Sequence, residues 1–301
     1  MKLVISASPH IDSGATTRKI MGDVLIALLP ALIAATVIFG WRALLVTAVC
    51  AAACVFFEWG FEKLCHKPST VGDLSAVVTG VILAYNLPVS IPLWQAVFGC
   101  LVAIVAVKQL FGGIGKNFAN PALVGRIVLF LSFSKTMTAW VFPDAVSSAT
   151  PLAQLATGQK PELWTLLLGN HGGCIGETCA LALLLGGAYL LLRGVITWQT
   201  PVCFVGTVFV LSLILGQDAV RQILSGGLLL GAFFMATDYV TAPQTCWGRA
   251  LFGIGAGLLT CLIRFYGSYA EGVSFAILFM NILTPYLSKW TRSKPLGGVP
   301  A

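Results

Sequence analysis

The feature that most constrains the fold is the scarcity of charge along 301 residues. Only 10% of the chain is Asp, Glu, Lys or Arg, whereas 57% is hydrophobic. A soluble globular domain carries about 25% charged residues. Because the chain has too few charges to cover a surface that faces water on all sides, the sequence predicts an integral membrane protein.

Long hydrophobic runs recur along the whole chain. About 20 apolar residues in a helix cross the hydrocarbon core of a bilayer. The runs therefore predict an all-α, polytopic membrane protein with ten transmembrane helices, the third of which is cut short by "NLPVSIP". The predicted spans are 22–39, 43–63, 71–87, 93–110, 122–142, 174–192, 198–216, 221–237, 248–265 and 272–288.

The distribution of positive charge predicts the orientation. Ten spans place both termini on one side, and most of the 18 Lys and Arg residues fall in segments on that side. Cytoplasmic segments carry such an excess. We therefore expect a multi-pass protein of the cell membrane with both termini in the cytoplasm. The net charge of +7 reflects this bias, so we expect no nucleic-acid partner.

The two halves of the chain resemble each other. "TGVILAYNLPVSIPLWQAVFG" (79–99) and "LGAFFMATDYVTAPQTCWGRALFG" (230–253) each contain a glycine, an apolar stretch, a break with proline and a Phe-Gly pair. Five spans per half would invert the second half, and broken segments at matching positions indicate a binding site. The expected division of the single membrane domain 1–301 is a cytoplasmic arm (1–21), a five-helix repeat (22–142), an extracytoplasmic loop (143–173), a second repeat (174–288) and a cytoplasmic tail (289–301).

The stretch "FGGIGKNFANPALVGR" (111–126) is the first candidate binding site. Gly112 and Gly113 allow the backbone to approach a ligand closely. Asn117 and Asn120 supply hydrogen-bond donors and acceptors. An ordinary re-entrant turn is the alternative interpretation, and the sequence leaves both open.

Three carboxylates are further candidates. Asp238, in "FFMATDYVTAP" (233–243), is either a functional group near the bilayer or the cap of a helix. Glu58, midway along the second predicted span, and Glu177, early in the sixth, are candidates for a proton or cation path. The nine cysteines and three histidines are scattered, and no catalytic motif is present. We therefore expect neither a metal site nor a catalytic residue.

Four stretches together resemble one family. "GGIGKNFANPALVG" (112–125), "DAVSSATPLA" (144–153), "GAFFMATDYVTAP" (231–243) and "EGVSFAILFMNILTP" (271–285) resemble the D subunit of the Rnf electron-transport complex. They are also similar to the B subunit of the sodium-translocating NADH:quinone reductase. The resemblance runs from about Ser8 to Pro285, and the short N-terminal arm fits the Rnf subunit better.

The resemblance implies a covalent flavin. In this family a threonine in a pattern like Asp-x-x-Ser-(Gly/Ser)-Ala-Thr carries FMN through its phosphate, attached by a flavin transferase outside the cytoplasm. The matching residues are Asp144, Ser147, Ser148 (in place of the commoner glycine), Ala149 and Thr150. The similar "DSGATT" (12–17) has His10 six positions before Thr16 and lies on the cytoplasmic side. Thr150 is therefore the expected FMN site, which would make the chain a flavoprotein and a phosphoprotein.

The resemblance also implies a function and its partners. We expect a redox subunit, not catalytic alone, of a complex that couples ferredoxin:NAD+ oxidoreduction to Na+ or H+ translocation across the lipid bilayer. Expected partners are the other Rnf subunits, notably the extracytoplasmic FMN-carrying subunit and the cytoplasmic NAD-binding subunit.

A second flavin is expected near Asn117, Asn120 and Asp238. A core of about 30 Å is too wide for one efficient electron hop from Thr150, and the family relative carries a non-covalent riboflavin. The alternative function is a secondary transporter or channel for a small polar solute, because the family's fold is similar to that of urea transporters.

Overall fold

The computed structural model of the chain describes residues 15–140, 150–267 and 272–292, and every regular element within these ranges is a helix. The first half contains α1 (Thr17–Phe39), α2 (Trp41–Leu64), η1 (Val71–Asp73), α3 (Ser75–Tyr85), α4 (Leu93–Leu101), η2 (Val102–Gln109), α5 (Pro121–Ser132) and α6 (Ser134–Met137). The second half contains α7 (Pro151–Ala156), α8 (Leu163–Leu168), α9 (Ala180–Leu192), α10 (Gln199–Ile214), α11 (Ala219–Leu224), α12 (Leu228–Leu230), η3 (Gly231–Met235), α13 (Cys246–Tyr266) and α14 (Val273–Trp290). The predicted all-α class is confirmed.

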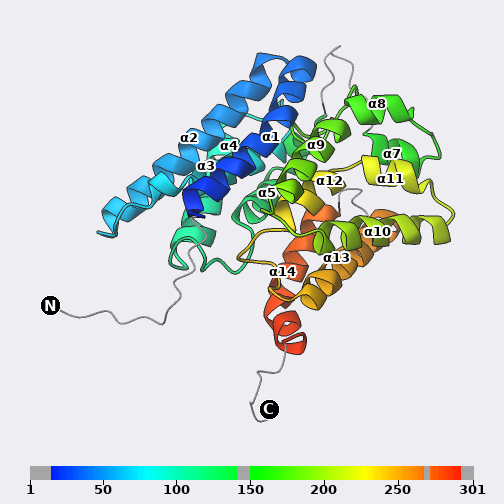
Figure 1. Ribbon diagram of the computed structural model, residues 1–301. Coiled ribbons are helices and arrows are strands. Elements are labelled where there is room, and N and C mark those ends of the chain that lie inside the picture. The colour runs from blue at the N-terminus through cyan, green and yellow to red at the C-terminus, as the bar shows by residue number, and fades with distance from the viewer. Residues whose placement is uncertain (1–14, 141–149, 268–271, 293–301) are drawn as a thin grey trace, which may run out of the picture.

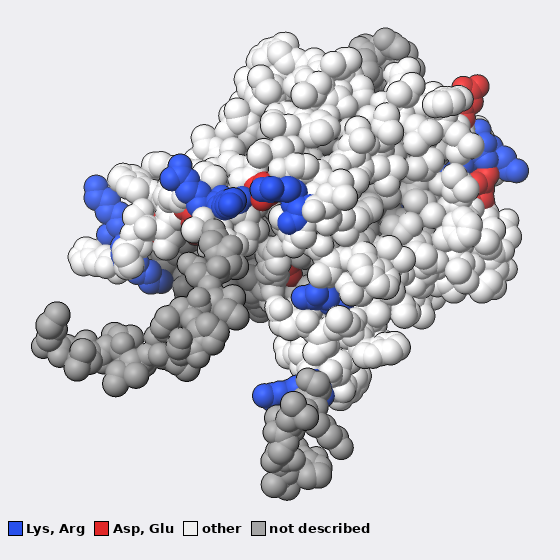
Figure 2. Space-filling model, in the orientation of Figure 1, with Lys and Arg blue, Asp and Glu red and all other residues white. Residues whose placement is uncertain are grey.

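The surface is that of a protein surrounded by lipid. Figure 2 shows that most of the visible surface is uncharged and that most of the visible Lys and Arg gather on the side where α1 begins and α14 ends. Large apolar side chains lie exposed, among them Leu192 (88%) and Trp247 (77%). In the described part of the chain, α1, α2 and α13 are long and apolar enough to cross a bilayer, and five further apolar helices are shorter. The count of ten spans therefore stays a prediction.

Several predicted spans differ from the helices that form, and those at 71–87 and 122–142 are each divided into two helices. The span predicted at 221–237 is divided, because Gly226 and Gly227 adopt φ values of 69° and 65° between α11 and α12. Such positive values cannot continue a right-handed helix. The span predicted from residue 174 begins only at Ala180, so Glu177 lies in the loop before α9 and not within a helix.

The predicted proline-bearing breaks are both present, at 86–92 after α3 and at 236–245 after η3. The loop before α9 bonds to the first break, because Gly176 N donates to Tyr85 O at 2.9 Å and Ile175 N donates to Leu87 O at 3.0 Å. A Cβ atom at Gly176 would lie 2.3 Å from the Tyr85 side chain, so only glycine fits. Protein thus satisfies the carbonyl groups that the helix leaves free.

Helices at matching positions of the two predicted repeats pack against each other. Figure 1 shows α1 to α5 forming one half of the molecule and α9 to α14 the other. Helix α1 contacts α9, and α5 contacts α14. A two-fold relation between the halves would produce both contacts, although the inverted repeat itself stays a prediction. Gly186 allows the first contact to be close, since a Cβ atom there would lie 2.1 Å from Ala27 O.

We predict that Gly186→Ala destabilises the fold, whereas the matched change Gly206→Ala does not. The added methyl group at residue 186 forces α9 away from α1, and such overpacking costs about 1–3 kcal/mol. Gly206 lies in α10 with open space around it, so alanine there should stabilise the helix by up to about 1 kcal/mol. Thermal unfolding in detergent should give a lower midpoint for the first variant than for the second. Equal midpoints would contradict the close packing of α1 on α9.

Candidate functional site

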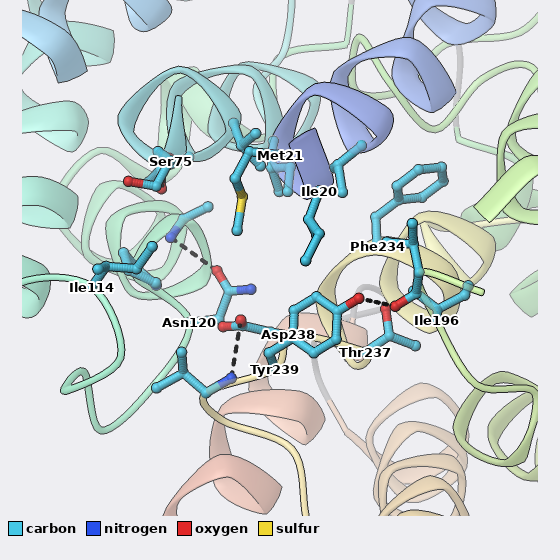
Figure 3. A pocket seen from close by; sticks show the side chains of 18 of the residues that line it. Ile20, Met21, Ser75, Ile114, Asn120, Ile196, Phe234, Thr237, Asp238 and Tyr239 are labelled. Carbon is cyan, nitrogen blue, oxygen red and sulfur yellow. Dashed lines mark hydrogen bonds between the residues drawn. The ribbon is translucent and has the colours of Figure 1, made fainter. Parts of the chain in front are cut away.

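A cavity of about 300 Å³ opens on the side of the molecule where α1 begins. Figure 3 shows Ile20 and Met21 of α1 pointing toward Asn120, Asp238 and Tyr239 on the opposite wall. The volume is at the lower end of the range for small-molecule and cofactor sites, which are mostly apolar with a few placed polar groups. The polar residues that line it are Thr17, Ser75, Thr79, Lys108, Asn117, Asn120, Thr237, Asp238 and Tyr239.

Local hydrogen bonds hold the two predicted asparagines, Asn117 and Asn120, at the start of α5 and in the loop before it. Asn120 is the N-cap of α5, and its Oδ1 accepts a bond from Ala122 N at 3.1 Å. Proline follows at the first helical position, where its missing N–H leaves no bond unmade. Asn120 Nδ2 also donates to Met235 O at 3.5 Å, and Asn117 Nδ2 donates to Ala119 O at 2.9 Å. These bonds orient both amides in the cavity wall.

Asp238 holds the turn that follows η3. Its Oδ1 accepts from Val240 N at 3.4 Å, and its Oδ2 accepts from the Thr241 hydroxyl at 3.2 Å. Helix α13 begins eight residues later and is capped by Thr245, so the interpretation of Asp238 as a helix cap is wrong. Burial raises the pKa of Asp238 above its ordinary value, while the two hydrogen bonds oppose that shift.

Gly112 and Gly113 do not line the cavity. They form the turn after η2 with φ values of 114° and 93°, and Ile114 of the same loop reaches the cavity wall. The structure therefore brings Asn117, Asn120 and Asp238 together and places the two glycines outside them.

The cavity wall also contains Lys108, which forms a buried ion pair with Glu58 that the sequence alone did not identify. Lys108 Nζ lies 2.8 Å from Glu58 Oε1 and 2.9 Å from Glu58 Oε2, and it donates to Ser75 Oγ at 2.6 Å. The neighbouring Gln109 Nε2 donates to Glu58 Oε1 at 2.9 Å. The sequence did contain a signal for this pair. Lys108 and Gln109 stand at the end of a hydrophobic run, and a cation at membrane depth requires a partner of opposite charge.

Glu177 lies in a different environment from Glu58. Its Oε1 accepts a hydrogen bond from Cys174 N at 3.1 Å. Its Oε2 lies close to Gly227, since a Cβ atom added at that glycine would be 2.8 Å from this oxygen. Neither carboxylate lines the cavity, but Glu58 pairs with Lys108, which does. The two candidate path carboxylates are therefore separate sites.

A central polar cluster was likewise not predicted from the sequence. Arg126 Nη1 donates to Asn86 Oδ1 at 3.2 Å, and Asn86 Nδ2 donates to Met235 Sδ at 3.4 Å. Arg126 Nη2 lies 3.7 Å from Cys174 Sγ. The cluster joins the break after α3 to the loop that carries Glu177. Asn86 stands at the predicted break, but nothing in the sequence pattern pairs it with Arg126.

Thr150 begins α7. Its Oγ1 accepts from Ala153 N at 3.3 Å, and Pro151 occupies the first helical position. A second cavity of about 330 Å³ lies beside this helix, lined by Leu152, Leu155, Ala156, Leu215, Gln217, Gln222, Arg264, Phe265 and Tyr266. The other predicted motif residues, Asp144, Ser147, Ser148 and Ala149, lie outside the described residues. Thr16 is the N-cap of α1 and accepts from Lys19 N at 3.3 Å.

Comparison with known proteins identifies relatives along almost the whole chain. The profile of the NQR2, RnfD, RnfE family matches residues 4–297. The D subunit of the Na+-translocating ferredoxin:NAD+ oxidoreductase complex of Acetobacterium woodii is 47% identical, with 99% of this chain and 96% of that protein covered. The D subunit of the proton-translocating complex of Clostridium ljungdahlii is 40% identical, with coverages of 97% and 96%. The D subunit of the ion-translocating oxidoreductase complex of Actinobacillus succinogenes is 34% identical, with 97% of each chain covered.

We predict that Asn120→Ala lowers stability and that Asn120→Ser largely preserves it. Alanine removes the N-cap of α5, which costs about 0.5–2 kcal/mol, whereas the serine hydroxyl still caps the helix. The midpoint of thermal unfolding in detergent measures the difference. If both variants unfold at the wild-type temperature, the amide of Asn120 does not hold α5.

Proposed function

The chain belongs to the NQR2, RnfD, RnfE family, and we propose that it is the membrane-embedded, flavin-carrying D subunit, an electron-transfer component, of an ion-translocating ferredoxin:NAD+ oxidoreductase complex. The observation that carries the proposal is the similarity to such D subunits over nearly the full length of the chain. In this chain Asn117, Asn120 and Asp238, from two of the family's motifs, line one mostly apolar cavity. The rival function, transport of a small polar solute, has no support from these relatives, which are named as subunits of oxidoreductase complexes.

We propose the cell membrane as its location, with ten spans in two inverted sets of five and both termini in the cytoplasm. The gathering of Lys and Arg on the side where α1 begins supports this orientation, because cytoplasmic segments carry such an excess. The cavity with Asn117, Asn120 and Asp238 would then face the cytoplasm. Partners would include the extracytoplasmic FMN-carrying subunit and the cytoplasmic NAD-binding subunit.

Thr150 is the proposed site of covalent FMN, attached by a flavin transferase. The residues fit such a group, since the second cavity beside α7 offers apolar walls together with Gln222 and Arg264. A phosphoester on the threonine would leave the ring free to exchange electrons singly or in pairs, while the protein supplies placement and electrostatics. Asp144, Ser147, Ser148 and Ala149 complete the proposed recognition motif.

We predict one FMN adduct on chain produced together with its flavin transferase. Thr150→Ala should lose the adduct, and Thr16→Ala should keep it, because Thr16 has His10 in place of an aspartate six positions before it and lies on the proposed cytoplasmic side. Intact-mass measurement and flavin fluorescence of the denatured band are the readouts. An adduct mapped to residue 16 would refute both the assignment and the orientation.

The cytoplasmic cavity is the proposed site of a non-covalent flavin, riboflavin. The amides of Asn117 and Asn120 and the carboxylate of Asp238 lie on one wall, and the aromatic residues Phe233, Phe234 and Tyr239 supply flat apolar surface. Gly112 and Gly113 would act by shaping the loop that carries Asn117. Glu58 and Glu177 are the proposed carboxylates of the path of the coupling ion.

We predict that acid extraction releases one free flavin from the purified wild-type chain while FMN stays bound. Asp238→Asn should reduce flavin retention about tenfold or more, because hydrogen bonds to a charged group contribute about 1.5–3 kcal/mol. Asn120→Ser should also weaken retention while α5 remains capped, which separates binding from folding. If acid extracts as much free flavin from both variants as from the wild type, the cavity is not the flavin site.

A further inference from the structure

The buried ion pair in the cavity wall carries an inference that rests on the proposed flavin and on the proposed ion role of Glu58. We propose that Lys108 is a counter-charge shared between Glu58 and the bound flavin. The ammonium neutralises Glu58 while the cavity holds no added charge. It turns toward the cavity when an electron arrives there, and Glu58 then takes up the coupling cation.

The geometry places Lys108 between two environments. Its side chain lies in the cavity lining, together with Ser75, to which it donates a hydrogen bond. On the other side it contacts both carboxylate oxygens of Glu58, whose side chain is 0% exposed. A lysine ammonium is a compact charge on a flexible stem of four carbons, so a rotation of the stem exchanges one partner for the other.

Glu58 keeps neutral hydrogen-bond partners when Lys108 turns away. Gln109 Nε2 donates to Glu58 Oε1 at 2.9 Å, and the Thr70 hydroxyl bridges Glu58 Oε1, at 3.1 Å, and Glu62 Oε1. Thr70 also bonds to Glu62, a second buried carboxylate that is 3% exposed. One ammonium therefore serves a cluster with two buried carboxylates, and a buried carboxylate without a counter-charge is costly. When Lys108 turns away, uptake of a monovalent cation removes that cost.

The charges balance through the exchange. One electron enters the cavity from the ferredoxin side of the complex, and one cation, Na+ or H+, enters at Glu58. When the electron leaves for the next carrier, Lys108 returns to Glu58 and expels the cation. Linkage is reciprocal, so a cation that binds more tightly in the reduced state also favours reduction. A coupling of ordinary size makes the cation affinity of the reduced state about 5 to 150 times that of the oxidised state.

The test is the midpoint potential of the non-covalent flavin in the purified complex, measured against Na+ at fixed pH and, without Na+, against pH. For the proton, the cation dependence is the part of the pH dependence that exceeds that of free riboflavin, whose ring takes up protons on reduction. In the wild type the potential should rise with one of these cations, which also identifies the coupling ion. Lys108→Met should lower the potential, because the cavity loses its cation. Glu58→Gln should raise it, because Lys108 is then free to face the cavity. Both variants should lose the dependence on the cation.

The controls separate this role from a structural one. Lys116 is an exposed lysine of the adjacent loop that does not line the cavity, so Lys116→Met should match the wild type in potential and in cation dependence. If the single variants fail to assemble, Glu58→Gln/Lys108→Gln removes both charges together and should show a low potential without cation dependence. Shifts of the single variants in the same direction, or full cation dependence in any Lys108 variant, would overturn the inference. Absence of free flavin from the wild-type complex would instead overturn the proposed function.

Discussion

Backbone that leaves the helix inside a bilayer must find its hydrogen-bond partners within the protein, and much of this structure follows from that requirement. The break after α3 exposes the carbonyl groups of Tyr85 and Leu87, and the loop before α9 supplies the N–H groups that bond to them. These two segments come from opposite halves of the chain. A break in one half thus fixes the position of the other half, and the loop that carries the candidate Glu177 is consequently attached to the centre of the fold.

The sequence predicted the elements whose signal is local. Hydrophobic runs located the longer helices and the prolines located both breaks, whereas the short helices α7 and α8 form in a segment that was expected to be a loop. The positions of Asn117, Asn120 and Asp238 in one cavity followed from placing all three on the same predicted side. Hydropathy could not show that Gly226 and Gly227 would divide a run that is apolar throughout, because their effect acts through φ and not through transfer energy.

The sequence did not predict which distant residues pair with each other. Glu58 and Lys108 are 50 positions apart, and each alone is an isolated charge within or at the edge of a hydrophobic run. Asn86 and Arg126 likewise belong to separate segments that meet only after packing. Composition indicates that such charges need partners, whereas only the fold decides which partners they obtain. For this reason the candidate carboxylates were recognised and their partners were not.

The position of Thr150 at the start of α7 has a consequence for maturation. Its hydroxyl oxygen accepts a hydrogen bond from Ala153 N, and the residue is only 9% exposed. The proposed esterification of this oxygen would require a transferase to reach a side chain that is enclosed in its own helix start. For that step the first turn of α7 would have to open, or not yet be formed. The proposed attachment would therefore belong to biogenesis, before the chain reaches its final fold.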